Sequence, residues 1–126
     1  MPTSIEHLKQ AKDNEDLAER LLRLGDEASD TWAATLMFYS ALHYGRSFLV
    51  RRGSTRISTH GGFESSFRRL WAGPPELFRH YRLLRTSSEN ARYDCITYNS
   101  SQAQRLRDQH LHPFRDAILA ALATAP

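Results

Sequence analysis

Apolar and small residues occupy almost every side of one helix-length segment, from Trp32 to Arg52. One thin polar stripe interrupts it, because Tyr39, His43 and Arg46 fall at helical spacing on one edge. A helix this apolar is typical of the centre of a bundle rather than its rim. Its polar stripe must therefore find partners inside the protein, in a second subunit or in a ligand. The main apolar stripe consists of Phe38, Leu42, Gly45 and Leu49.

The first half of the chain predicts two long helices. Apolar residues at helical spacing predict the first helix over residues 4–24, with Ser4 as its N-cap. Gly25 is expected to end this helix, because glycine commonly follows the last helical turn. The central apolar helix is expected to begin with Ser29 or Asp30 as its N-cap and to stop at Gly53.

The middle of the chain predicts a loop and two shorter helices. Residues 53–61 are rich in Gly, Ser and Thr, which is typical of a loop. A third helix is expected from Phe63 to Trp71, and Thr59 is a good N-cap residue for it. Pro75 suits the first turn of a fourth helix, whose apolar positions continue to about Arg85.

The last third of the chain predicts an irregular stretch followed by one long helix. Residues 86–99 have no clear period, apart from a turn of helix over 89–93. From Ser100 onward helical spacing continues across Pro113, which predicts either one kinked helix or two helices that meet there. No alternating strand pattern occurs. The sequence therefore predicts an all-α, antiparallel bundle of four to five helices, with residues 1–126 forming a single domain.

Charge is distributed unevenly along the chain. Residues 1–30 contain eight Asp or Glu against four Lys or Arg, whereas residues 46–92 contain ten Arg against three acidic residues. The basic block can bind the phosphates of RNA or of a nucleotide. The alternative is that it pairs with the acidic first helix, within the subunit or across a dimer. The candidate phosphate-binding residues are Arg46, Arg51, Arg52, Arg68 and Arg69.

Composition excludes several other classes. No uninterrupted apolar run approaches the ~18 residues of a membrane span, and the polar, acidic start argues against a secretory signal, so a cytoplasmic protein without a membrane partner is expected. Cys95 is the only cysteine, which rules out an internal disulfide and a thiolate metal site. We expect it to be a small buried packing residue. The histidines show no metal-binding spacing, so neither a metal nor another cofactor is expected.

Two sequence blocks follow a pattern known from one protein family. Residues 38–53, FYSALHYGRSFLVRRG, are followed after a short loop by Thr59 and His60, and a second block, SENARYD, spans residues 88–94. This pattern resembles HEPN domains, which are small helical-bundle proteins. The resemblance implies a two-fold homodimer. Many HEPN proteins are toxin, defence or stress-response ribonucleases, often accompanied by an antitoxin or a nucleotidyltransferase, and others are non-catalytic scaffolds or RNA-binding subunits.

The ribonuclease motif of that family is an Arg followed by a His four to six residues later. Arg105 with His110, and the nearby His112, resemble this motif. The implied chemistry needs no metal, because a neutral His accepts the proton of the ribose 2′-hydroxyl while Arg stabilises the charge on the phosphate. The family's Asn after the Arg is replaced by Leu106. Arg105 and His110 also lie roughly 140° apart around a helix, so they converge only through a kink or a dimer mate.

The polar stripe of the central helix needs complements from elsewhere in the chain. Glu89, Arg92 and Asp94 are the natural candidates, so we expect them to form an internal hydrogen-bond and ion-pair network with Tyr39 and His43. A ligand pocket built from the same residues is the alternative reading of this pattern.

Three functional hypotheses follow from these patterns. The first is a dimeric protein that binds RNA or a nucleotide through its arginine-rich middle. The second is a metal-independent ribonuclease of a toxin or defence system. The third is a non-catalytic helical scaffold or partner subunit without a nucleic-acid role. In each case we expect Trp32 to be a core or dimer-interface aromatic rather than a base-stacking one.

Overall fold

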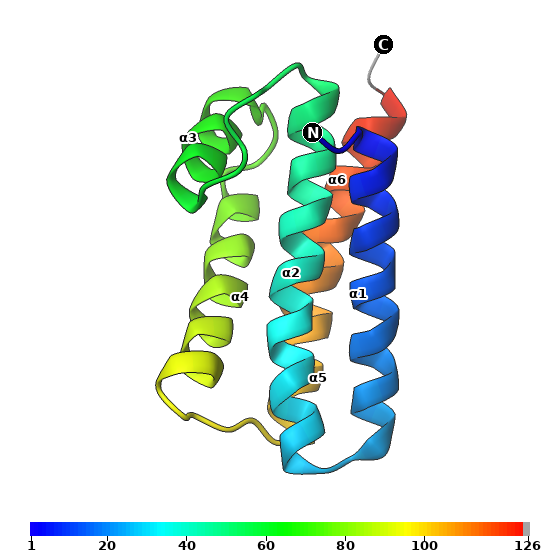
Figure 1. Cartoon of the computed structure of the whole chain (residues 1–126), viewed down its shortest axis with the longest axis vertical. Coiled ribbons are helices and arrows are strands. Elements are labelled where there is room, and N and C mark those ends of the chain that lie inside the picture. The colour runs from blue at the N-terminus through cyan, green and yellow to red at the C-terminus, as the bar shows by residue number, and fades with distance from the viewer. Residues whose placement is uncertain (125–126) are drawn as a thin grey trace.

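Helices form almost the whole of the molecule (Figure 1). The computed structural model describes residues 1–124, and no β-strand occurs among them. The bundle contains three long helices, α1 (Ser4–Leu24), α2 (Glu27–Arg51) and α4 (Glu76–Tyr93), and the C-terminal helix is the fourth. The short α3 (His60–Leu70) lies at the end of the bundle where α2 finishes and α4 begins. The expected all-α bundle of four to five helices is confirmed.

The C-terminal helix continues without interruption past Pro113. It consists of α5 (Ser100–Leu106), a π-helical turn η1 (Arg107–Leu111) and α6 (His112–Thr124). Proline has no N–H for the usual bond to the carbonyl four residues earlier. The turn before Pro113 is widened instead, and the N–H of His112 donates to the carbonyl of Arg107, five residues back. One continuous helix is therefore confirmed, and the two-helix alternative is wrong.

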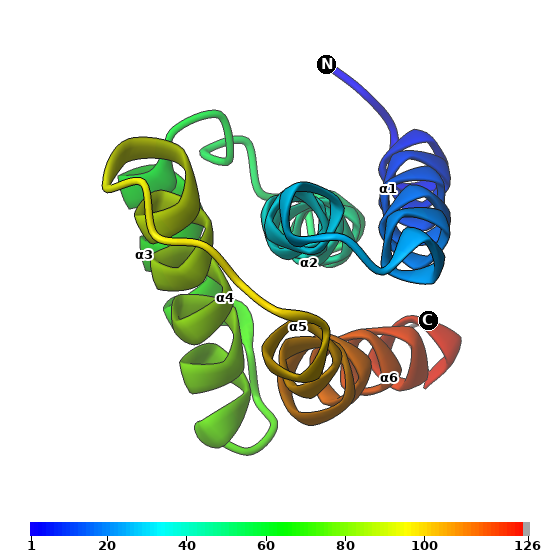
Figure 2. The same ribbon diagram turned by 90° about the horizontal axis from the view of Figure 1, so that it is seen from below.

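The central position of α2 explains its apolar sequence. Seen from below, α2 lies between α1 on one side and the α3–α4 pair on the other, with α5 and α6 beside it (Figure 2). It contacts all of these helices. The predicted apolar stripe is fully buried, and aromatic rings of α3, α4 and α6 surround it. These rings belong to Phe63, Phe67, Tyr81 and Phe114.

One glycine of α2 lets a neighbouring ring approach the helix closely. A Cβ atom built on Gly45 would lie 2.5 Å from the Cζ atom of Phe63, which is far inside van der Waals contact. Trp32, by contrast, does not belong to the core, since 60% of its surface is exposed. A core role for Trp32 is therefore wrong, while its role in a dimer interface stays a prediction.

The first two helices begin earlier than their predicted caps. Thr3, not Ser4, is the N-cap of α1, because its hydroxyl accepts the N–H of Glu6 at 3.1 Å and the Glu6 carboxylate accepts the N–H of Thr3 at 2.9 Å. Asp26 caps α2 by accepting the N–H of Ser29 at 2.8 Å. Asp30 is instead buried, and its carboxylate accepts the Ser100 hydroxyl at 2.7 Å. Asp30 therefore lies within α2 and contacts α5, so it does not act as the N-cap.

The predicted irregular stretch is largely helical. The helix α4 continues to Tyr93, because Leu84 and Ser88 extend its buried face by one more turn and tertiary packing outweighs the weak helix propensity of Ser and Asn. Only residues 94–99 form a connection. Cys95 lies in this connection, exposed and with a positive φ of 55°, so the expectation that it is buried is wrong. Thr59 is confirmed as the N-cap of α3.

None of the helices between residues 1 and 124 combines the length and the apolar composition that a membrane-spanning segment requires.

Candidate nucleic-acid interface

The acidic first helix is paired with the C-terminal helix, not with the basic middle of the chain. The Glu15 carboxylate accepts a 2.5 Å hydrogen bond from Arg115, and Glu19 lies 3.2 Å from Arg107. Glu15 also accepts the Tyr44 hydroxyl at 2.8 Å. The expectation that the acidic helix neutralises the arginine-rich middle within the subunit is therefore wrong. Two carboxylates of α1, Glu15 and Glu19, are thus used in contacts with α6 and η1.

The basic middle consequently keeps most of its charge. Seven of its arginines are exposed and form no salt bridge with any residue of 1–124. Among the described residues, Arg85 is the one arginine of this block that forms salt bridges, because its guanidinium lies against the carboxylates of both Glu64 and Glu89. The seven are Arg51, Arg52, Arg56, Arg68, Arg69, Arg79 and Arg82.

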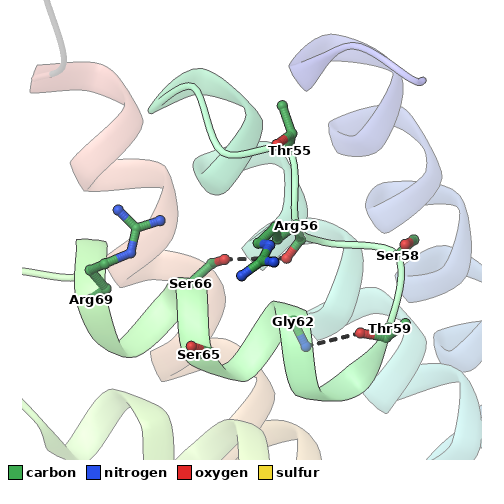
Figure 3. A pocket seen from close by; sticks show the side chains of 8 residues that line it. All are labelled: Thr55, Arg56, Ser58, Thr59, Gly62, Ser65, Ser66 and Arg69. Atoms are coloured by element: carbon green, nitrogen blue, oxygen red, sulfur yellow. Dashed lines mark hydrogen bonds between the residues drawn. The ribbon is translucent and has the colours of Figure 1, made fainter.

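A polar hollow opens beside the start of α3 (Figure 3). Its volume is about 540 Å³, and its lining combines Arg56 and Arg69 with hydroxyl groups from the preceding loop and from α3. Thr59 holds the helix start by accepting the N–H of Gly62 at 2.9 Å. Ser66 donates to the carbonyl of Arg56 at 3.2 Å and so fixes the loop against α3. Cationic and hydroxyl donors thus surround one recess, a combination suited to phosphate oxygens.

Further hollows continue this surface from α3 onto α4. A hollow of about 590 Å³ shares Arg69 with the first and adds Arg68. Another, of about 350 Å³, shares Arg68 and adds Arg79 and Arg82. The guanidinium groups of Arg68 and Arg82 lie 4.5 and 5.7 Å from the ring centre of Phe78. We call the continuous set of Arg56, Arg68, Arg69, Arg79 and Arg82 the arginine surface.

The predicted phosphate-binding residues do not all lie in one environment. Arg68 and Arg69 belong to the arginine surface, and Arg51 and Arg52 lie exposed at the end of α2. Arg46 is half-buried, and its Nε donates to the carbonyl of Ile57 at 3.1 Å.

Three members of the arginine surface, Arg56, Arg79 and Arg82, are not among the five candidate phosphate-binding residues predicted from the sequence. Arg56 was visible as part of the basic block, and Arg79 and Arg82 share the i, i+3 spacing that places them on one face of a helix.

The predicted ribonuclease residues face different parts of the bundle. His110 contacts α4, where its Nδ1 lies 2.9 Å from Nδ1 of His80. His112 faces α1 instead, with its Nε2 3.9 Å from the Glu15 carboxylate, and its Nδ1 is 3.9 Å from Asp108. Arg105 is exposed and forms no salt bridge within residues 1–124. The π turn therefore does not bring the three side chains to one point within the subunit.

The predicted polar network is divided into separate contacts. Arg92 donates to the Tyr39 hydroxyl at 2.9 Å, as the stripe pattern indicated. His43 lies against His7 of α1, with 3.0 Å between their Nδ1 atoms. Glu89 contacts Arg85, and Asp94 is exposed just beyond α4. Only Tyr39 and Arg92 of the predicted group thus meet directly.

The two histidine contacts have common electrostatic properties. Burial, followed by the charge of Arg46, lowers the pKa of His7, and the same two causes lower that of His43 to about 4. Burial also lowers the pKa of His80 and of His110. All four imidazoles are therefore neutral at pH 7. His7 was missed by sequence reasoning because a lone histidine on an amphipathic helix carries no pairing signal.

No protein family, no curated protein and no solved structure matches this chain. Within residues 1–124, no group of three or more His, Cys, Asp or Glu residues is arranged to hold a metal ion.

Proposed function

We propose that the protein binds RNA through the arginine surface of α3 and α4, together with Arg51 and Arg52 at the end of α2. The observation that carries this proposal is that Glu15 and Glu19 of α1 pair with Arg115 and Arg107, and not with the basic middle. It leaves seven exposed arginines of the basic middle without an ionic partner in residues 1–124. Binding of a phosphate backbone would neutralise them with release of counterions.

The extent of the arginine surface favours binding of a polyanion over binding of a single ion. The hollows share lining residues, so their cations follow one another from Arg56 at the loop to Arg82 on α4. Phe78 supports two of these guanidinium groups, which lowers the entropy lost when they bind phosphates. The resemblance to HEPN domains favours RNA among the polyanions that such a surface could bind.

The proposal is binding without cleavage. His110 and His112 contact different helices, and within residues 1–124 Arg105 forms no hydrogen bond with either, so the subunit offers no assembled acid–base pair beside a phosphate. A homodimer and an antitoxin or nucleotidyltransferase partner stay predictions from the resemblance. Measurement of the molar mass by light scattering would test the homodimer, which should have twice the mass of the 14.5 kDa chain.

Fluorescence anisotropy with a labelled 12-nucleotide RNA tests the proposal. We expect binding that weakens steeply with salt, and a triple variant, Arg68→Gln, Arg69→Gln and Arg82→Gln, should lower the logarithmic salt slope by about 2. The matched control is Arg20→Gln with Arg23→Gln, two exposed arginines of α1 that form no salt bridge within residues 1–124. Absence of RNA binding at low salt, or equal losses in both variants, would favour the helical scaffold without a nucleic-acid role.

A further inference from the structure

Two apolar recesses flank Trp71, in the segment that joins α3 to α4. The first has a volume of about 400 Å³ and lies between the end of α2, this segment and α6. The second has a volume of about 340 Å³ and lies between α3 and the start of α4. Both volumes fall within the range of roughly 300–1,000 Å³ that is typical of small-ligand sites. Trp71 and Gly73 line both recesses, so the two are adjacent.

The indole ring of Trp71 is held in place and offers an apolar surface. It stacks on Phe67 with 5.5 Å between the ring centres, and it contacts Phe48 edge-on at 5.3 Å. Its Nε1 donates to the carbonyl of Pro74 at 3.1 Å, so the polar atom of the ring is already satisfied. Phe67 and Phe48 are buried, whereas Trp71 is half-buried and therefore accessible to a ligand. Such a ring is suited to stacking rather than to hydrogen-bonded recognition.

One arginine lines each recess. Arg52, at the end of α2, lines the first recess and lies 5.0 Å from the ring centre of Phe48. Arg68 of α3 lines the second recess and lies 4.5 Å from the ring centre of Phe78. No acidic side chain of residues 1–124 lines either recess. An apolar recess with a cation in its wall is complementary to a ligand that combines a flat apolar part with a negative group.

The two recesses connect separate parts of the proposed RNA-binding surface. The second recess shares Arg68 with two hollows of the arginine surface, and the first recess reaches Arg52. Cationic hollows therefore continue into apolar recesses along one path from Arg82 to Arg52. This alternation fits a single strand, whose phosphates and base faces are both accessible. A duplex stacks its bases inside the helix, so it presents no base face to an apolar recess.

We propose that the recesses beside Trp71 bind unpaired bases of single-stranded RNA, while Arg52 and Arg68 bind the adjoining phosphates. This inference rests on the proposed function and specifies its ligand as single-stranded rather than duplex RNA. The bases stack on Trp71 and are not read by hydrogen bonds to their edges, so binding tolerates different bases.

Two oligomers of equal charge separate base binding from phosphate binding. Dodecauridylate and a 12-residue ribose-phosphate oligomer without bases carry the same number of phosphates, so arginine contacts alone would bind them equally. We expect dodecauridylate to bind at least about tenfold more tightly in fluorescence anisotropy, with the same salt slope. In a Trp32→Phe variant, Trp71 is the remaining tryptophan. Its fluorescence should be quenched by dodecauridylate, but not by the oligomer without bases or by duplex RNA.

A substitution that fills the first recess tests the site itself. Ala120 of α6 lines this recess and is exposed, so Ala120→Met occupies the space without removing a core contact and keeps a good helix former. It should weaken binding of dodecauridylate about fivefold and leave binding of the oligomer without bases unchanged. The matched control is Ala123→Met, because Ala123 is an exposed alanine of the same helix outside the lining of both recesses. Melting temperatures verify that both variants fold.

The outcomes distinguish this inference from the proposed function. If both oligomers bind equally, if duplex RNA quenches Trp71 as strongly, or if Ala120→Met binds dodecauridylate as tightly as Ala123→Met, base binding is overturned. RNA binding through phosphates alone would then still hold. If neither oligomer binds at low salt, the proposed function is overturned as well. A lower molar mass of Ala120→Met in light scattering, with unchanged affinity for dodecauridylate, would overturn base binding and assign the recess to a contact between subunits.

Discussion

The Nδ1 atoms of His7 and His43 lie 3.0 Å apart across the contact between α1 and α2. At this distance one nitrogen donates a proton and the other accepts it, so at least one of the two rings must be neutral. Protonation of both would place two cations side by side in a largely buried contact. His80 and His110 repeat the arrangement between α4 and η1, with 2.9 Å between the same atoms. Two of the bundle's helix contacts therefore contain a histidine pair in which both rings cannot be protonated at once.

This arrangement predicts that stability decreases in mild acid. The pKa of His43 falls from 6.5 to about 4 on folding, first because of burial and then because of Arg46 and His7. As the pH decreases below about 6.5, the unfolded chain binds protons that the folded protein excludes. The free energy of unfolding should thus change little between about pH 7 and 9 and decrease between about pH 6.5 and 4. Urea unfolding at a series of pH values measures it. The double variant His7→Gln, His43→Gln should show a shallower decrease, and an unchanged curve would contradict the role of this pair.

Gly45 should tolerate no side chain. Alanine is the better helix former by about 1 kcal/mol, but its Cβ would lie 2.5 Å from the fully buried ring of Phe63, and such overpacking costs about 1–3 kcal/mol. We expect Gly45→Ala to lower the free energy of unfolding and Gly45→Leu to prevent stable folding. Gly61→Ala in α3 is the matched control, because its Cβ would have no neighbour within 4 Å. Equal melting temperatures for Gly45→Ala and Gly61→Ala would show that the ring of Phe63 can move aside.

The contact between Arg92 and Tyr39 should contribute to stability across α2 and α4. Arg92 also donates to the Ser88 hydroxyl at 3.0 Å, and Ser88 is fully buried. Arg92→Ala should cost about 1–2 kcal/mol, because it leaves both hydroxyl groups without this donor. A double-mutant cycle with Tyr39→Phe isolates the pair, and we expect a coupling of about 1 kcal/mol in chemical unfolding. If Arg92→Ala abolished RNA binding while the melting temperature stayed the same, the ligand-pocket reading of these residues would gain support instead.

Much of the fold could be predicted because apolar spacing reports burial directly. The α2 stripe of Phe38, Leu42 and Leu49 is buried as its periodicity indicated, and the bounds of α1 follow from its apolar positions. The prediction from apolar spacing was wrong over residues 86–93, because Ser and Asn favour loops in isolation. There one turn of packing around the buried Ser88 extends the helix, and this depends on contacts that no local pattern contains.

The candidate site was harder to predict because the ionic partner of a charged side chain depends on how the helices pack in three dimensions. The basic block was evident, but whether α1 neutralised it depended on which helix α1 packs against. Arg107 and Arg115 lie about 90 to 100 positions away from their α1 partners. The pairing of His43 with His7 likewise requires the relative rotation of two helices, which sequence spacing within either helix leaves open.

The capping box of α1 gives a further prediction. The Thr3 hydroxyl accepts the N–H of Glu6, and the Glu6 carboxylate returns the interaction to the N–H of Thr3. Thr3→Ala removes the hydroxyl that accepts the Glu6 N–H, although the backbone N–H of residue 3 can still donate to the Glu6 carboxylate, so it should reduce the free energy of unfolding by about 1 kcal/mol. Ser101→Ala is a suitable control, because Ser101 is an exposed helical residue whose side chain forms no hydrogen bond within residues 1–124. Glu6→Gln keeps an acceptor at the same position, so it should cost less than Thr3→Ala. A larger loss for Glu6→Gln would mean that the carboxylate charge near the positive end of the helix dipole, rather than the reciprocal hydrogen bonds, stabilises the start of α1.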